Sequence, residues 1–197
     1  MIGIVDYGAG NLQSVQNAFA KAGAEFALVH DAEGLRRASK IVLPGVGHFG
    51  AMMRALEAGG LRDEIKARVD DGVPFLGVCL GFQALFEGSA EAPETPGLGI
   101  FHGRVERFPD DAPVPHMGWN TLERVKPSRL FAEAAGERHV YFAHSYYAPV
   151  GQEAAMVCRY SRPFMAAAER GHCFGVQFHP EKSGAAGLEI VRRFAQL

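Results

Sequence analysis

Short apolar runs alternate with amphipathic stretches along the first 86 residues of the chain. The runs have the length and content of strands, whereas the stretches between them repeat apolar residues at helical spacing. This alternation is typical of parallel strands joined by crossover helices. The predicted strands cover residues 2–5, 26–30, 40–43 and 74–78, and the predicted helices cover residues 12–22, 49–57, 61–71 and 80–86.

The pattern changes after residue 86. Residues 87–99 are acidic and rich in proline and glycine, which indicates an exposed loop. Because the candidate site needs residues from both halves, we predict one domain over residues 1–197 rather than a boundary in this loop. The expected fold is α/β, with a central, largely parallel mixed sheet flanked by helices. Further strands are predicted at residues 100–108, 140–143, 154–160 and 173–178, and a last helix at residues 185–195.

Composition narrows the classes of function. A hydrophobic content of 48% over 197 residues excludes a disordered chain. The 20 basic and 22 acidic residues give a formal net charge of −2, so neither nucleic acid nor an anionic membrane surface is an expected partner. The most apolar stretch, residues 73–86, is too short to span a membrane.

Cysteine and histidine usage argues against a metal centre. Cys79, Cys158 and Cys173 include no C-x-x-C pair, and their odd number does not indicate a disulfide framework. This usage fits a reducing compartment, so we expect a cytoplasmic protein. The eight histidines include no H-x-x-x-H or H-E-x-x-H spacing, and we expect no metal and no cofactor. Packing or surface roles are expected for His102, His116, His139, His144 and His172.

The strongest local signal is the sequence G-V-C-L-G at residues 77–81, which follows a predicted buried strand and begins a helical pattern. This is the arrangement of a nucleophile elbow, in which Cys79 would lie at a strained turn. Gly77 and Gly81 would let strand and helix approach closely, and amides at the helix N-terminus would favour the thiolate. The pentapeptide also leaves open a buried, unreactive thiol between two turn glycines.

A base for this nucleophile is available in His179-Pro180-Glu181, at the end of an apolar run. Residues two apart in an extended segment project to the same side, so Glu181 can orient the His179 ring while that ring faces Cys79. Taken alone, the tripeptide is more typical of a solvated turn. Its occurrence together with the elbow favours a Cys-His-Glu triad.

A further glycine cluster, P-G-V-G-H-F-G at residues 44–50, matches the dinucleotide-binding pattern G-x-G-x-x-G, with Asp70 about 20 residues further on. We reject that function because the cluster follows a later strand and Asp70 closes a helix rather than a strand. Its backbone amides suit the stabilisation of an oxyanion. A tight strand-to-helix loop is the alternative.

Three motifs in chain order resemble the class I glutamine amidotransferase domain: PGVGHFG at 44–50, GVCLG at 77–81 and GVQFHPEKS at 175–183. The resemblance covers nearly the whole chain and implies a flavodoxin-like fold. It also implies hydrolysis of glutamine to glutamate and ammonia through a cysteine thioester. The stretches 7–11, 115–120 and 141–146 resemble one branch of that family, the glutaminase subunits of imidazole glycerol phosphate synthase in histidine biosynthesis.

The same resemblance assigns roles to individual residues. It implies Cys79 as the nucleophile, His179 as the general base and acid, and Glu181 as the partner that orients the histidine. It further implies that the Val46 peptide acts as a switch, so that the glutaminase is slow until a partner subunit holds its own ligand. The residues implied around the substrate glutamine are Gln83, Ser145 and Tyr146, and those at the oxyanion are Gly47 and Leu80.

A partner is implied as well, a (β/α)₈-barrel cyclase that accepts the ammonia within a heterodimer. A single glutaminase domain uses up the 197 residues, which leads us to expect the acceptor site on a separate chain. Glutaminases of pyridoxal phosphate, anthranilate or guanylate synthesis, and cysteine hydrolases of related fold, are the alternatives. The residues that match positions near the interface are Asn11, Trp119, Tyr141 and Lys182.

Overall fold

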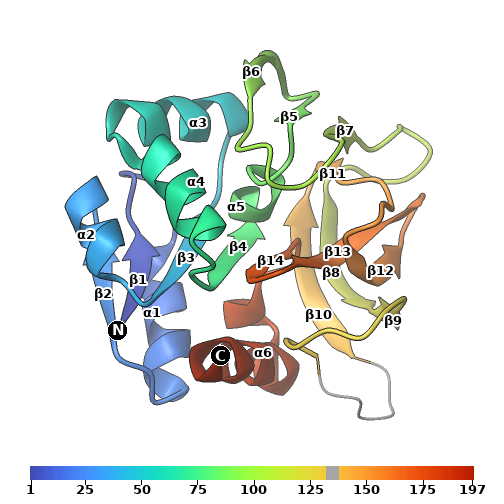
Figure 1. Ribbon diagram of the computed structural model, residues 1–197. Helices are drawn as coiled ribbons and strands as arrows, with labels where there is room; N and C mark the ends of the chain where they lie inside the picture. Colours follow the sequence, from blue (N-terminus) through green and yellow to red (C-terminus); the bar gives the residue numbers. More distant parts are fainter. Residues whose placement is uncertain (132–137) are drawn as a thin grey trace.

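Parallel strands form the centre of the computed structural model, which describes residues 1–131 and 138–197 (Figure 1). Hydrogen-bonded neighbours follow the order β2-β1-β3-β4-β14, the doubly wound order of flavodoxin-like folds. In such folds, ligands bind outside the carboxyl ends of the strands. The strands are β1 (Ile2–Val5), β2 (Phe26–Val29), β3 (Lys40–Gly45), β4 (Phe75–Cys79) and β14 (Cys173–Val176).

Strand register brings the sequence motifs to one edge of this sheet. β3 and β4 pair in parallel so that Gly45 lies beside Cys79, and β14 pairs with the other side of β4, with Val176 beside Val78. The segment that follows β14 therefore leaves the sheet next to Cys79, and it carries His179. The motifs that contain Gly45, Cys79 and His179 are far apart in the sequence but lie at the carboxyl ends of three neighbouring strands.

Mostly antiparallel strands extend the main sheet and build the rest of the fold, with β5 and β7 as a parallel pair. Among the described residues, β13, β12 and β9 continue the main sheet, β8 and β10 form a ribbon, and β11, β7, β5 and β6 form a small sheet. The ribbon lies against the segment after β14, because the His179 backbone N–H donates to the Tyr141 carbonyl at 2.9 Å. The bounds are β5 (Gly88–Ser89), β6 (Ala92–Pro96), β7 (Arg104–Arg107), β8 (His116–Thr121), β9 (Glu123–Arg124), β10 (His139–His144), β11 (Tyr146–Tyr147), β12 (Ala154–Arg159) and β13 (Pro163–Arg170).

Side chains of the parallel strands bury two hydrophobic cores, one on each face of the sheet. Val5 and Leu43 belong to the core that α2, α3 and α4 cover, whereas Ile4 and Val42 belong to the core that α1 and α6 cover (Figure 1). Neighbouring residues face opposite cores because side chains alternate along a strand. The helices are α1 (Leu12–Lys21), α2 (Ala32–Arg37), α3 (Phe49–Ala58), α4 (Leu61–Asp70) and α6 (Gly184–Gln196).

The predicted α/β fold with a largely parallel mixed sheet is confirmed, and most predicted elements lie within a few residues of their expected bounds. The helix predicted for residues 80–86 is wrong beyond its first turn, because α5 covers only Leu80–Gln83. The Ala84 carbonyl instead accepts a hydrogen bond from the Leu98 N–H at 2.8 Å. A returning loop therefore takes an acceptor that a longer helix would need.

The segment 87–99, predicted as an exposed loop, contains the antiparallel pair β5–β6, with Ser89 and Leu98 buried. The sequence pattern also missed α2 and the strands β8 and β13. α2 is short and begins at Asp31, whose carboxylate accepts from the Gly34 N–H at 2.8 Å. β8 has the sequence HMGWNT, which lacks the β-branched alternation of a typical strand.

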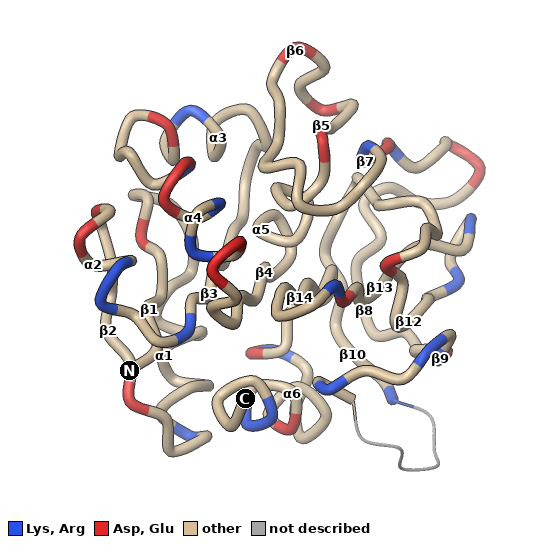
Figure 2. The backbone as a smooth tube through the Cα atoms, viewed as in Figure 1, with Lys and Arg blue, Asp and Glu red and all other residues tan. Residues whose placement is uncertain are grey.

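Basic and acidic residues are interleaved along α2 and α4 (Figure 2). Arg36 of α2 and Glu64 of α4 form an ion pair with a 2.8 Å contact, which joins the two helices at the surface. This mixing agrees with the net charge of −2. Across residues 1–131 and 138–197, we find no helix with the length and apolar content that crossing a membrane requires.

Candidate active site

Cys79 lies at a sharp turn between β4 and α5. Its φ of 55° and ψ of −108° place it in a region that L residues rarely adopt, and it is the only non-glycine residue with positive φ in the described part of the chain. A Cβ on Gly77 would lie 2.6 Å from the Gly81 carbonyl oxygen, and a Cβ on Gly81 would collide with the Leu43 carbonyl. The two glycines therefore permit the close approach that the strained turn requires, as the elbow hypothesis predicts.

His179 joins Cys79 to Glu181. The His179 Nδ1 atom lies 2.8 Å from the Glu181 carboxylate, and both side chains are about 95% buried, with 6% and 5% exposed. Burial alone would lower the pKa of His179, but hydrogen bonds to Cys79 and to Glu181 raise it to about 10. Since Nδ1 faces the carboxylate, the other ring nitrogen is left for the thiol. The structure thus brings the three predicted triad residues into one connected group.

A turn with exposed amides lies beside the thiol. Gly45 pairs with Cys79 in the sheet, and the chain then passes through Val46, which is 42% exposed, and Gly47, which has a φ of 97°. Outside Gly47 and its two chain neighbours, no atom of the described residues lies within 4 Å of the position that a Cβ on Gly47 would take, so the space beside its Cα is open. On the other side of the thiol, Leu80 begins α5, so its backbone N–H follows the nucleophile directly. Both backbone segments line the cavity next to the thiol, and backbone N–H groups in such a place can stabilise an oxyanion.

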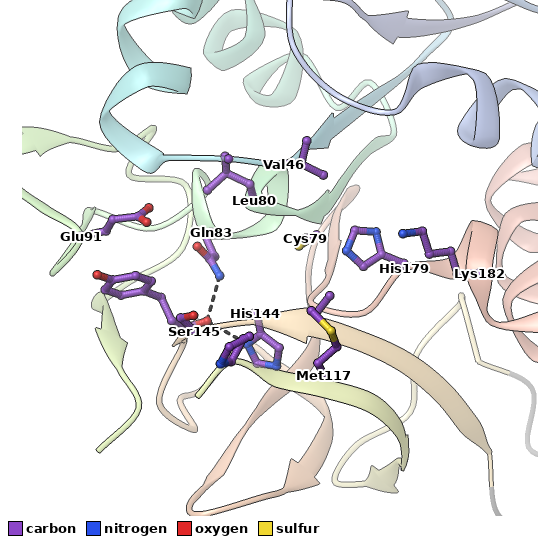
Figure 3. Close-up of a pocket in the computed structure, with 14 residues that line it drawn as sticks. Val46, Cys79, Leu80, Gln83, Glu91, Met117, His144, Ser145, His179 and Lys182 are labelled. Atoms are coloured by element: carbon purple, nitrogen blue, oxygen red, sulfur yellow. Dashed lines mark hydrogen bonds between the residues drawn. The ribbon is translucent and has the colours of Figure 1, made fainter. Parts of the chain in front are cut away.

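A cavity of about 360 Å³ opens over this group (Figure 3). Its size suits a small polar ligand such as an amino acid. The close-up shows Cys79 and His179 at one side, with Gln83, Glu91 and Ser145 at the other. The lining residues are Val46, Gly47, Cys79, Leu80, Gln83, Glu91, Pro115, Met117, Ala143, His144, Ser145, Tyr146, His179 and Lys182.

Gln83 connects the two sides of the cavity. Its Nε2 atom donates to the Tyr146 carbonyl at 2.9 Å (Figure 3). The same atom donates to Gln177 Oε1 at 3.0 Å, so both amide hydrogens have acceptors. The His144 Nδ1 atom donates to the same Tyr146 carbonyl at 2.8 Å. The predicted substrate residues Gln83, Ser145 and Tyr146 therefore lie together on one wall.

Sequence reasoning missed several residues of this site. Glu91 comes from the segment predicted as an exposed loop, and its carboxylate accepts from the Phe49 N–H at 2.7 Å at the rim of the cavity. Nothing in the local sequence marks it, because its place depends on the β5–β6 pair. His144 was expected to have only a packing or surface role, yet it lines the cavity and holds the Tyr146 carbonyl.

The residues predicted near a partner interface fall into two groups. Trp119 of β8 meets Tyr141 of β10 edge to face at a centroid distance of 6.1 Å, and the Lys182 ammonium lies 5.7 Å from the Tyr141 ring. Trp119 is 56% exposed. Asn11 caps α1 by accepting from the Ser14 N–H at 3.4 Å, and it lines a small pocket with His179 and Glu181.

The other two cysteines are buried and free. Burial raises the pKa of Cys158 to about 12, and it raises that of Cys173 still further. Neither thiol lines the cavity. Among the described residues, no group of three histidine, cysteine or acidic side chains is arranged to hold a metal ion.

Known proteins match nearly the whole of this chain. A chain named "Imidazole glycerol phosphate synthase subunit HisH" from Methanothermobacter thermautotrophicus is 47% identical over 199 residues, which cover 100% of this chain and 98% of that relative. A protein of the same name from Geobacillus thermodenitrificans is 46% identical over 202 residues, covering 98% of this chain and 94% of the relative.

Solved structures show the same fold. A structure described as a glutamine amidotransferase superposes with a TM-score of 0.78 at 22% identity, over 100% of this chain and 99% of the other. The structure of PurLQS from Thermotoga maritima superposes with a TM-score of 0.77 at 18% identity, over 99% and 97% of the two chains. The family model described as "Glutamine amidotransferase class-I" matches residues 3–196. With that match and these full-length relatives, the chain belongs to the class-I glutamine amidotransferase family.

Proposed function

We propose that this chain, as one domain over residues 1–197, is the glutaminase of an imidazole glycerol phosphate synthase and supplies ammonia for histidine biosynthesis. One observation carries the proposal: a thiol at a strained turn lines the same cavity as a buried histidine, and that histidine is held by a carboxylate at 2.8 Å. This group lies at a cavity of about 360 Å³, a suitable size for glutamine. The names of the full-length relatives support the choice of pathway.

Acylation begins with attack of the Cys79 thiolate on the side-chain amide carbon of glutamine. The carbonyl electron pair moves onto oxygen and gives a tetrahedral intermediate. His179 is protonated at neutral pH, since its pKa is raised to about 10, and it donates its proton to the amide nitrogen. The carbon–nitrogen bond then breaks, so ammonia leaves and a thioester remains on Cys79.

Deacylation uses the same residues, but His179 now accepts a proton first, whereas in acylation it donated one. His179, now neutral, takes a proton from water as the water oxygen attacks the thioester carbon. The second tetrahedral intermediate expels the Cys79 thiolate, which releases glutamate and restores the thiolate–imidazolium pair. Glu181 holds the ring orientation throughout, because it remains bound to Nδ1.

Backbone amides would hold the oxyanion in both halves. Leu80 N–H is fixed by the elbow, whereas the Val46–Gly47 peptide belongs to an exposed turn. Loss of one such donor typically costs roughly 2.7 to 4 kcal/mol of barrier, so rotation of that peptide would suffice to switch the enzyme.

The wall opposite the thiol would bind the amino-acid end of glutamine. Glu91 offers a carboxylate for the ammonium group, and the backbone of Ser145 and Tyr146 offers further polar contacts. Gln83 can use its Oε1 atom toward the substrate, since its Nε2 hydrogens are donated elsewhere. Substrate and nucleophile would then be held by different parts of the fold.

A (β/α)₈-barrel cyclase is the proposed partner, docked over the cavity mouth. Met117 is 64% exposed and lines the cavity together with Val46, and Trp119, two residues further along β8, is 56% exposed. Exposed apolar and aromatic side chains are typical of protein interfaces. A docked partner would also shelter the ammonia from protonation in water. We propose Tyr141, Lys182 and Asn11 as further interface residues, and the cytoplasm as the compartment.

The test uses Cys79→Ala in the complex reconstituted with the cyclase. Glutamine-dependent synthesis should be abolished, whereas ammonium salts should still support product formation because they bypass the glutaminase. Cys158→Ala serves as the matched control, since its thiol lies away from the cavity, and it should retain both activities. Failure of ammonium to rescue Cys79→Ala would contradict the role as ammonia donor.

A further inference from the structure

A fully buried glutamine lies next to the nucleophile and does not line the cavity. Gln177 follows β14 directly and is 0% exposed, and its Nε2 atom lies 3.7 Å from Cys79 Sγ. Gln177 lies two residues before His179 in the sequence, so the Cys79 sulfur has a second polar neighbour besides that histidine. Because glutamine carries both an N–H donor and a carbonyl acceptor, the chemical effect depends on which end faces the sulfur.

The hydrogen-bond partners of Gln83 fix that choice. The Tyr146 carbonyl can only accept, so Gln83 must present its NH₂ group there, at 2.9 Å. The same Nε2 atom lies 3.0 Å from the Gln177 amide, and the Gln177 group that can accept this hydrogen is Oε1. Gln177 must then turn its own NH₂ group toward Cys79 Sγ.

Two buried histidines hold the Tyr146 carbonyl in its place. His144 donates from Nδ1 to that carbonyl, so when neutral its Nε2 atom is an acceptor, and His116 Nδ1 donates to it at 3.0 Å. The far ring atom of His116 faces the Asn120 NH₂ group at 3.4 Å. The Asn120 carbonyl is already bound by the Thr121 N–H at 2.8 Å. The hydrogen bonds that lead from Asn120 through His116 to His144 therefore run toward the Tyr146 carbonyl. The Asn120 NH₂ group also donates to the Arg159 carbonyl at 3.0 Å.

The surroundings keep both rings neutral and fixed. His116 is 4% exposed and stacks between Phe142 and Tyr160 at centroid distances of 4.8 and 4.1 Å. Burial lowers the pKa of His116 to about 4 and that of His144 to about 3. Protonation of either ring would place two donors face to face and break the chain.

We propose that Gln177 is a further catalytic residue, whose amide N–H stabilises the Cys79 thiolate, and that Gln83, His144 and His116 are positioning residues that fix this donor toward sulfur. The inference rests on the proposed role of Cys79 as nucleophile. Sulfur carries negative charge before it attacks glutamine and again when it leaves the second tetrahedral intermediate. A donor directed at Sγ favours both states, whereas a carbonyl in its place would oppose them.

The test measures the pH profile of Cys79 alkylation by iodoacetamide in the full chain, with the adduct located by mass spectrometry. Gln177→Met keeps the length of the side chain but removes the donor. Its alkylation profile should move to higher pH by roughly one to two units, the scale of one hydrogen bond to a charged group. Gln196→Met, at an exposed site in α6, is the control and should match the unaltered chain. A Gln177→Met profile that coincides with the unaltered one overturns the proposal.

A second measurement covers the case in which Gln177→Met does not fold. In the unaltered chain, the side-chain ¹⁵N–¹H signals of Gln177 should shift with the same pH midpoint as alkylation, and by more than those of Gln83. Equal or absent shifts overturn the proposal. The glutaminase activity of Cys79→Ala distinguishes failure of the proposed function from failure of the proposed role of Gln177. If Cys79→Ala keeps its glutaminase activity, the proposed function is wrong. If Cys79→Ala loses its activity but the alkylation profile of Gln177→Met is unchanged, only the role of Gln177 is wrong.

Discussion

The two sides of the cavity are built differently. The nucleophilic side comes from the carboxyl ends of β3, β4 and β14, where parallel pairing holds Gly45 beside Cys79 and leads the chain on to His179. The substrate side comes from antiparallel ribbons and a returning loop, which supply Glu91 and Tyr146. The first side is closely packed around Cys79 and encoded in short motifs, whereas the second depends on pairings between distant segments. Substitutions should therefore abolish chemistry on the first side and weaken binding or stability on the second.

The largest expected effect is that of His179→Ala, which removes the proton donor and acceptor on the nucleophilic side. The glutaminase rate should fall by roughly a thousandfold, within the range for general acid–base groups. His172→Ala is the matched control, because that histidine is exposed. Steady-state release of glutamate by the complex measures both, and a loss in His179→Ala below tenfold would contradict the proposed mechanism.

Gly81→Ala tests the close packing of the same side. The new Cβ would collide with the Leu43 carbonyl, so the elbow must open, and we expect a loss of about 3 kcal/mol in the free energy of unfolding. Gly151→Ala is the control, since its Cβ would find contacts no shorter than 3.6 Å. Urea unfolding of both variants gives the comparison. Equal stability of the two would show that the close packing at Gly81 is not required.

The smallest expected effect concerns the substrate side and its pH dependence. Burial lowers the pKa of His144 from 6.5, the value expected in the unfolded chain, to about 3 in the native chain. At a pH between these two pKa values, the unfolded chain binds a proton at His144 that the native chain does not bind. Native stability therefore falls as pH drops, by about 2 kcal/mol from this residue between pH 7 and pH 5. His144→Phe should flatten that slope in urea unfolding, while His172→Ala should leave it unchanged. An unaltered slope in His144→Phe would assign the acid sensitivity to other groups.

The sequence allowed good prediction where function depends on neighbours along the chain. Gly77, Cys79 and Gly81 are within five residues, and His179 and Glu181 are two apart, so their geometry follows from strand and turn rules. These rules also predicted the parallel core, because its apolar runs are continuous.

Prediction failed where long-range pairing decides the structure. Glu91 reaches the cavity through the β5–β6 pair, and His144 meets His116 only because β8 pairs with β10. Gln177, in contrast, is marked in the sequence, because it is a polar residue inside the apolar run that ends at Phe178. A buried polar side chain requires partners, and those partners proved to be part of the site.

The burial of Cys158 and Cys173 determines which cysteine a chemical label will modify. Their raised pKa values keep both as thiols at neutral pH, and the thiolate is the form that electrophiles and peroxides attack. A probe directed at thiolates should therefore report on the elbow alone in the unmodified chain. The fold thus provides a natural single-site reporter, with no need to remove the other two cysteines.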